Sequence, residues 1–260
     1  MPTTFGDIDP LAFRLGDAEV LKMYFGDVLA WQPDSGVTID AYGPGSYQEF
    51  SSTYGGSSPP GQLITPYNHG GDEPSMVIGC ISGYRTSSLT MQFYMEYGGV
   101  AMTPIGATQW GNDSSGSNSS FFQWFGLTDP PAGTQEVRGY WYGSSWASPF
   151  INVQTVSFNG AGSWLGAYSA GGTESGEALS QSIPSAEGEL VLQAFMYEGL
   201  SSTSTPYPGS YDGTLIRYLD GGYAKGILGR KPGDSTVTFT ATRASGADYL
   251  ESAIRIVPEP

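Results

Sequence analysis

The sequence predicts an all-β fold: an antiparallel β-sandwich of jelly-roll type, preceded by a small N-terminal β-meander. Charged residues make up only 13% of the 260 residues and aromatic residues another 13%. This composition suits strands joined by turns better than helices with charged surfaces. Apolar and polar residues alternate over 91–97, 236–242 and 250–256, which is typical of strands with one face on a core and one in water. An up-and-down barrel is the main alternative.

The composition divides the chain into three parts. Residues 1–33 include Gly-Asp turns at 16–17 and 26–27 between short apolar runs. They predict a meander of about three strands, with a helix over 18–25 as the alternative. Residues 34–75 are rich in Gly, Pro and Ser and predict a connection with one candidate strand at 37–42. Residues 76–260 predict the sandwich domain, with strands at 76–82, 88–97, 120–127, 134–142, 150–158, 189–198, 213–219, 235–242 and 248–257.

The charge of the chain argues against two classes of partner. The formal net charge is −15, from 10 basic and 25 acidic residues. Nucleic-acid binding is not expected, because phosphate neutralisation needs clustered Lys and Arg and the sequence has no such cluster. Membrane insertion is not expected either, since no apolar run reaches the length of a span. The first residues lack the charged and apolar regions of a signal peptide, so we expect synthesis in a cytoplasm without one.

The residues needed for nucleophilic or metal chemistry are scarce. His69 is the only histidine, and its Gly-rich surroundings predict a surface loop. A nucleophilic serine needs a neighbouring base, and no Gly-x-Ser-x-Gly elbow is present. One histidine and one cysteine, Cys80, cannot supply a zinc site. Three Asp-containing segments leave a calcium site open but are more typical of turns. We therefore predict no cofactor and no enzymatic activity.

Acidic residues leave one enzymatic alternative open. Glu96 and Glu198 fall on predicted strands among tyrosines, as the paired carboxylates of a jelly-roll glycoside hydrolase do. Such a pair must lie about 5–10 Å apart, which sequence spacing alone does not establish.

Aromatic residues concentrate in the middle of the chain, and consecutive rings occur at 121–125 and 140–142. Consecutive residues of a strand point to opposite faces, so a single core cannot bury all of these rings. We therefore predict an exposed aromatic binding surface formed by Trp124, Trp141 and Trp146. A subunit interface is the favoured use of this surface, and sugar binding is the alternative.

Two segments resemble known proteins. Residues 15–31, LGDAEVLKMYFGDVLAW, resemble a short segment that recurs in tail-associated proteins of tailed phages of actinobacteria, with Phe25 where that pattern has Leu. Residues 97–104, YGGVAMTP, followed by residues 125–137, FGLTDPPAGTQEV, resemble the signature of a β-sandwich domain of bacterial and phage surface proteins. The first segment covers under a tenth of the chain, and the second marks a fold rather than a chemistry.

Together these resemblances imply a mycobacteriophage-like minor tail protein: a virion component with other virion structural proteins as partners, located on the tail rather than the head. They imply a homo-oligomer, with a trimer favoured, and contact with a host cell-envelope glycan. The apolar residues of 11–32 predict that this stretch docks on a neighbouring subunit, with Tyr24, Phe25 and Trp31 in the assembly interface. A capsid decoration protein and a carbohydrate-binding or glycoside-hydrolase-like jelly roll remain as alternatives.

Overall fold

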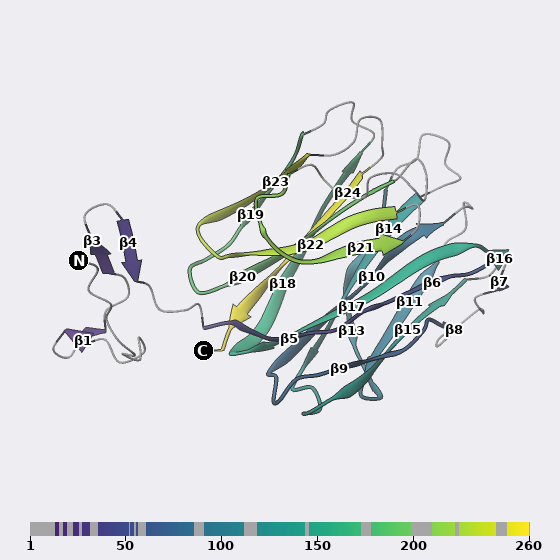
Figure 1. The fold of residues 1–260 in the computed structure, drawn as a ribbon, viewed down its shortest axis with the longest axis horizontal. Helices are drawn as coiled ribbons and strands as arrows, with labels where there is room; N and C mark the ends of the chain where they lie inside the picture. Colours follow the sequence, from purple (N-terminus) through teal and green to yellow (C-terminus); the bar gives the residue numbers. More distant parts are fainter. Residues whose placement is uncertain are drawn as a thin grey trace, which may run out of the picture.

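The computed structural model shows an all-β chain of antiparallel sheets (Figure 1). None of the described residues forms a helix, and accordingly none forms a helix that could cross a membrane. The structure describes residues 14–15, 18–19, 23–25, 28–31, 36–51, 53–54, 56, 61–85, 91–111, 119–143, 146–172, 178–198, 210–221, 224–242 and 249–259.

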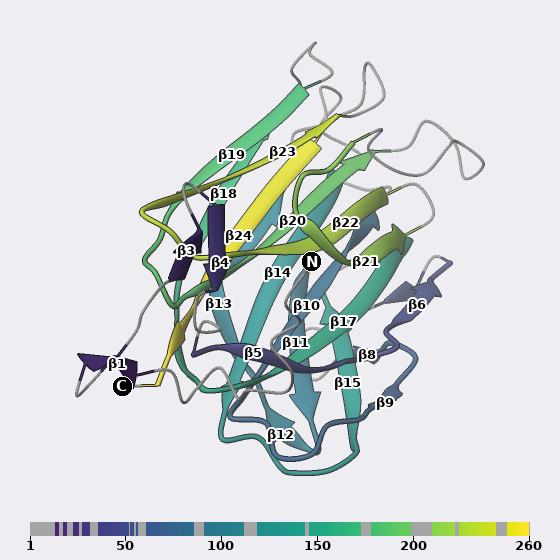
Figure 2. The ribbon, with the colours of Figure 1, turned by 60° about the vertical axis from the view of Figure 1, so that its left-hand side comes forward.

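A six-stranded sheet, here called the central sheet, lies in the middle of the main body (Figure 2). Its strands follow the order β13-β14-β10-β17-β5, and β6 also pairs with β17. The strands are β5 (Thr38–Tyr42), β6 (Ser46–Glu49), β10 (Met76–Arg85), β13 (Thr103–Trp110), β14 (Ser119–Thr128) and β17 (Pro149–Asn159).

Two five-stranded sheets flank the central sheet. The lower sheet in Figure 1 contains β8 (Gln62–Leu63), β9 (Tyr67–His69), β11 (Gln92–Tyr97), β12 (Val100–Ala101) and β15 (Gln135–Tyr142). The upper sheet contains β18 (Ala161–Gly172), β20 (Leu190–Glu198), β21 (Thr214–Gly221), β22 (Ala224–Pro232) and β24 (Tyr249–Pro258). Two smaller sheets pair β19 (Ala178–Pro184) with β23 (Thr236–Thr242), and β7 (Thr53–Tyr54) with β16 (Trp146–Ala147).

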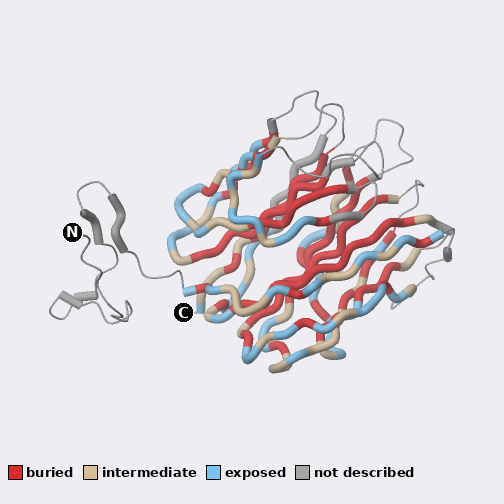
Figure 3. Tube along the Cα trace, viewed as in Figure 1, coloured by how far each residue is buried: buried red, intermediate tan, exposed pale blue. Residues whose placement is uncertain are grey.

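Three hydrophobic cores separate these sheets. The lower core packs the central sheet on the lower sheet, and the upper core packs the opposite face of the central sheet on the upper sheet. A third core packs the upper sheet on the β19–β23 pair. The buried residues accordingly run through the middle of the main body, and the exposed ones lie mostly along its outer strands (Figure 3).

The central strands are buried on both faces, and this resolves the problem of the consecutive rings. Phe121 and Phe125 lie in the lower core, whereas Phe122 and Trp124 lie in the upper core. The prediction that some of these rings must be exposed was wrong for Trp124 and Trp141, because it assumed a single core, whereas Tyr142 of the second run is half-buried. Trp124 keeps only 1% of its surface exposed and Trp141 keeps none.

The described residues of 34–75 form more strands than the single strand predicted for a connection. β5 and β6 continue the edge of the central sheet along β17. β8 and β9 pair with β15 of the lower sheet. The prediction of a connection with one candidate strand was therefore wrong for the described residues of this stretch.

The N-terminal part forms two separate strand pairs instead of one three-stranded meander. β1 (Arg14–Leu15) pairs with β2 (Ala18–Glu19), and β3 (Met23–Phe25) pairs with β4 (Val28–Trp31). Among the described residues, these four strands pair with no strand of the main body. The docking role of this part therefore stays a prediction.

The first testable prediction concerns Trp124, whose ring joins two sheets. Its indole N–H donates a hydrogen bond of 2.7 Å to the Ser252 hydroxyl of β24. We expect Trp124→Ala to lower the free energy of unfolding by about 3–5 kcal/mol, because it leaves a cavity and an unpaired hydroxyl. Chemical denaturation measures this change, and Leu165→Ala, at a position 45% exposed, is the control. A loss for Trp124→Ala no larger than for the control would contradict burial in the upper core.

Candidate functional site

A break in the edge of the central sheet creates the candidate site. β17 pairs with β6 over residues 150–153 and with β5 over residues 156–159, so Gln154 lies beside the turn that joins the two edge strands. Gly45 in this turn has a φ of 69°. A Cβ atom there would lie only 1.6 Å from the Gln154 amide nitrogen. Glycine at this position therefore lets the Gln154 side chain lie directly against the turn.

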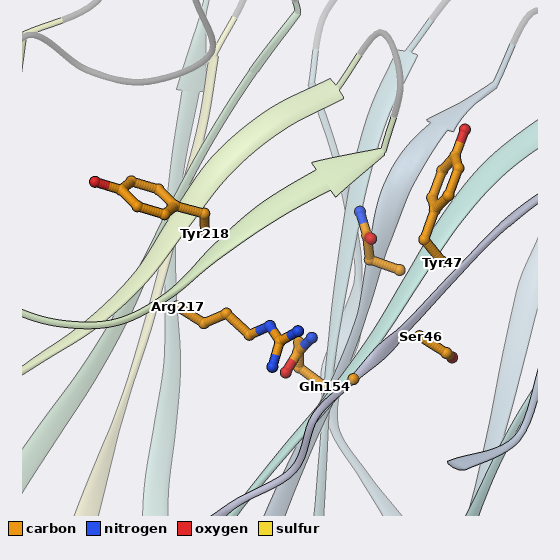
Figure 4. A pocket seen from close by; sticks show the side chains of 7 residues that line it. Ser46, Tyr47, Gln154, Arg217 and Tyr218 are labelled. Atoms are coloured by element: carbon orange, nitrogen blue, oxygen red, sulfur yellow. The ribbon is translucent and has the colours of Figure 1, made fainter.

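A cavity of about 180 Å³ opens at this break, between the edge of the central sheet and β21 of the upper sheet. Its lining is polar apart from two tyrosines and comprises Gly45, Ser46, Tyr47, Asn152, Gln154, Arg217 and Tyr218. Figure 4 shows the ends of Arg217 and Gln154 close to one another, and Tyr218 turned away from them. Successive residues of a strand point to opposite faces, so Tyr218 lines the cavity with its backbone while Arg217 presents its side chain.

The strand pairing fixes which groups share the cavity face of the central sheet. Tyr47 and Asn152 are direct cross-strand partners, and Gln154 follows two residues after Asn152, so these three side chains leave the same face. Ser46 is adjacent to Tyr47 and points away, as Figure 4 shows. The cavity thus combines one tyrosine ring, two amides and, from the opposite sheet, one guanidinium.

Arg217 is held in place by its own strand and by the turn. The register between β21 and β22 shifts between Leu215 and Arg217, and such a bulge re-aims the side chains that follow it. The Arg217 guanidinium donates a hydrogen bond of 3.1 Å to the carbonyl of Gly43. Arg217 is also the one charged residue among those that line the cavity.

A second polar cluster lies buried between the central and lower sheets, around His69. Its ring nitrogens lie 2.7 Å from the Thr155 hydroxyl (Nδ1) and 3.0 Å from the Ser157 hydroxyl (Nε2). The Ser157 hydroxyl donates to Asp40 at 2.8 Å, so its oxygen accepts a hydrogen bond from the His69 Nε2–H. Thr155 then donates to Nδ1 and accepts from the Tyr67 hydroxyl at 2.9 Å. The bonds run in one direction, from Tyr67 to Asp40.

Burial favours the uncharged forms of His69 and Tyr67 in this cluster. Loss of hydration lowers the pKa of His69 to about 4, against the opposing effect of the Asp40 carboxylate. Burial also raises the pKa of the Tyr67 phenol, despite its hydrogen bond to Thr155. His69 is therefore an uncharged imidazole and Tyr67 a protonated donor at neutral pH.

The His69 cluster brings together a histidine, a serine and an aspartate, but in an arrangement that cannot reach a substrate. His69 and Ser157 have no exposed surface, and Ser157 lies between the histidine and the aspartate rather than at the end of the chain. The prediction that His69 lies in a surface loop was wrong: it ends strand β9. The sequence does hold a sign of this cluster: Thr155 and Ser157 are two residues apart in a largely apolar strand. They therefore lie on the same face of that strand, the face that contacts His69.

The aromatic binding surface expected from the sequence does not form at the predicted residues. Trp124 and Trp141 are core residues, and the side chain of Trp146 lies outside the described part of the chain. The side chains of Tyr24, Phe25 and Trp31 also lie outside it, although their backbones belong to β3 and β4. The exposed ring at the cavity belongs instead to Tyr47, 43% exposed, in the part predicted as a connection.

The paired-carboxylate alternative fails on distance. Glu96 lies on the outer face of the lower sheet, where the hydroxyls of Tyr94 and Tyr140 donate to it. Glu198 belongs to β20 of the upper sheet, so the central sheet separates the two. Two packed layers correspond to about 20 Å, beyond the reach of a glycosidase pair. Within the described ranges, no three His, Cys, Asp or Glu residues gather into a metal site.

Comparisons with models of protein families, with curated proteins and with solved structures find no match to this chain.

The second prediction concerns the His69 cluster and pH. Because the pKa of folded His69 is lowered from 6.5 to about 4, the unfolded state binds more protons between these pH values. Above pH 6.5 His69 is neutral in both the folded and the unfolded state, so its protonation does not lower the free energy of unfolding. The free energy of unfolding falls by roughly 2 kcal/mol as the pH drops from 6.5 to 4, after allowance for solvent screening.

Denaturant unfolding at several pH values, compared between the parent chain and His69→Gln, isolates this contribution. We expect the parent chain to lose stability more steeply than His69→Gln in this window. Asn68→Gln, at the exposed neighbouring position, is the control and should follow the parent profile. Parallel profiles for the parent and His69→Gln would contradict a buried neutral histidine.

Proposed function

We propose that this chain is a structural, non-enzymatic virion protein, specifically a minor tail protein displayed at the tail or tail tip, whose main body is a jelly-roll-like β-sandwich. The observation that carries the proposal is the resemblance of residues 15–31 to a segment of phage tail proteins. In support, the strands of this segment pair only with one another among the described residues. No other described strand lies along their outer edges, as strand addition by a neighbouring subunit would require.

The second resemblance gains support from how its two halves meet. Tyr97 of the first half is the cross-strand partner of Val137 in the second. The Gly98 N–H donates a hydrogen bond of 2.9 Å to the Glu136 carbonyl. Gly98 and Gly99 have φ angles of 58° and 77°, as a two-residue hairpin turn with both central residues at positive φ requires. Thr103 and Pro104 also pair with Gly126 and Phe125 in the central sheet, so the two halves of the signature meet in both sheets, as a fold marker for a surface-displayed domain would.

The positions of the candidate residues support some of the alternative functions more than others. The burial of Ser157 and His69 and the separation of Glu96 from Glu198 favour the non-enzymatic reading. A homotrimer stays part of the proposal through the resemblance alone, because all the rings of the two aromatic runs except the half-buried Tyr142 are buried within the chain. Decoration of the capsid is the second structural role, and a carbohydrate-binding module is favoured specifically by the cavity beside Gln154.

The third prediction tests the docking segment in the particle. A chain that starts at residue 35 retains Val37, a residue of the upper core. We expect it to fold with a loss of less than about 1 kcal/mol in unfolding free energy, yet to be absent from purified particles. Immunogold labelling of particles assembled with the full chain should mark the tail.

A double variant, Tyr24→Ala with Trp31→Ala, removes two side chains without shortening the chain. We expect it also to be absent from purified particles. Leu63→Ala, an exposed position of the main body, is the control and should be incorporated normally. Label on the capsid would replace the tail assignment by decoration. Unfolding of the shortened chain would show that the segment completes the core, which is the opposite of docking.

A further inference from the structure

The cavity beside Gln154 contains a hydrogen-bond donor that the described chain does not satisfy. Asn152 is only 5% exposed, and its amide nitrogen has no partner within the described residues. Leaving such a donor unpaired costs about 1–3 kcal/mol. Unlike the unpaired Tyr97 hydroxyl and Trp141 indole nitrogen, which lie in the lower core, this donor belongs to a residue that lines a cavity. We propose that the cavity binds a single sugar ring that carries a carboxylate, such as a uronic acid unit of a surface glycan.

A second unpaired polar group lies next to Asn152, behind the lining of the cavity. Ser82 of β10 is its direct cross-strand partner, and the buried Ser82 hydroxyl also lacks a partner in the described part of the protein. Both side chains leave the face of the central sheet that turns toward the upper sheet, as Cys80 and Val156 do. Of these two neighbouring unpaired groups, Asn152 lines the cavity and is the one that a ligand hydroxyl group would satisfy, directly or through water.

Arg217 gives the cavity its charge preference. Its bond to the Gly43 carbonyl fixes the side chain before any ligand arrives, and the remaining N–H groups of the guanidinium stay available as a planar fork. A carboxylate matches this fork with two parallel hydrogen bonds. None of the described lining residues carries a carboxylate. The chain as a whole has a net charge of −15, so Arg217 places a positive charge at this cavity on an otherwise acidic protein.

The size and the rim of the cavity limit the ligand to one ring. A volume of about 180 Å³ corresponds to roughly six waters of liquid and falls below the roughly 300–1,000 Å³ of sites for larger ligands. Tyr47 stands at the rim with 43% of its surface exposed and offers a flat apolar face, as ligand sites combine aromatic walls with a few placed polar groups. The cavity therefore suits a terminal or branching sugar unit whose neighbours stay in solvent.

This inference rests on the cavity alone and does not require the virion assignment. The isolated full chain is titrated with methyl glucuronide, with methyl glucoside and with acetate, and binding is followed by NMR and calorimetry. We expect a millimolar dissociation constant for the glucuronide, and binding at least about tenfold weaker for the other two. The glucoside lacks the partner of Arg217, and acetate lacks the ring and its hydroxyl groups.

Three variants locate the binding. Arg217→Gln and Asn152→Ala should each weaken glucuronide binding by about tenfold or more. Asn152→Ala should leave the thermal unfolding midpoint unchanged or raise it, because it removes an unpaired donor; a merely structural asparagine would show a lower midpoint. Tyr94→Ala, a tyrosine on the outer face of the lower sheet, is the control and should bind as the parent does.

Each other outcome overturns the proposal. Equal binding of glucuronide and glucoside would show that Arg217 does not select a carboxylate. Equal binding of glucuronide and acetate would show an anion site without sugar recognition. Binding that survives both Arg217→Gln and Asn152→Ala would place the ligand elsewhere, and the absence of glucuronide binding at high millimolar concentration would leave the cavity without this ligand.

Discussion

The burial of both faces of the central sheet is the constraint on which the rest of the structure depends. In β10 and β17, alternate side chains point into the lower core and into the upper core. Neither strand therefore has a face on which a polar side chain would avoid the free-energy cost of burial. Close packing then requires small residues where the layers approach. A Cβ atom at Gly126 would lie 2.7 Å from the Trp164 ring, and Gly126 is therefore a packing residue of the upper core.

Polar groups inside such a stack must find partners within the protein, and most of them do. His69 uses both ring nitrogens, and Glu189 accepts from Arg255, Ser185 and the Ala186 amide. Asn152 is one of several exceptions among the described residues, which include Ser82, Tyr97 and Trp141, and it is the one that lines the cavity at the break in the edge of the central sheet. The same turn serves both polar regions: a Cβ at Gly43 would collide with Thr155 and His69, while its carbonyl holds Arg217. The candidate site and the buried cluster thus depend on one short segment.

The all-β class and the main strands follow from the sequence, because period-2 alternation reports a strand with a single buried face. β11 and β23 show it plainly, with buried and less buried residues in turn. The double burial of β10 and β14 could not be predicted this way, since an apolar run does not tell how many layers cover it. Tyr47, Asn152 and Arg217 come from three separate strands, and no spacing in the sequence relates them. His69 was misplaced for a related reason: its Gly-rich neighbours describe the turn after β9 and carry no information about the sheet that covers it.

Amide hydrogen exchange tests the central claim most directly, because it reports the stability of each strand separately. If the central sheet is covered on both faces, the amides of β10 and β17 exchange slowest and at rates set by unfolding of the whole main body. The amides of β8 and β12, short strands of the lower sheet, exchange faster through local opening. Exchange of β10 and β17 as fast as that of β8 and β12 would contradict the layered account.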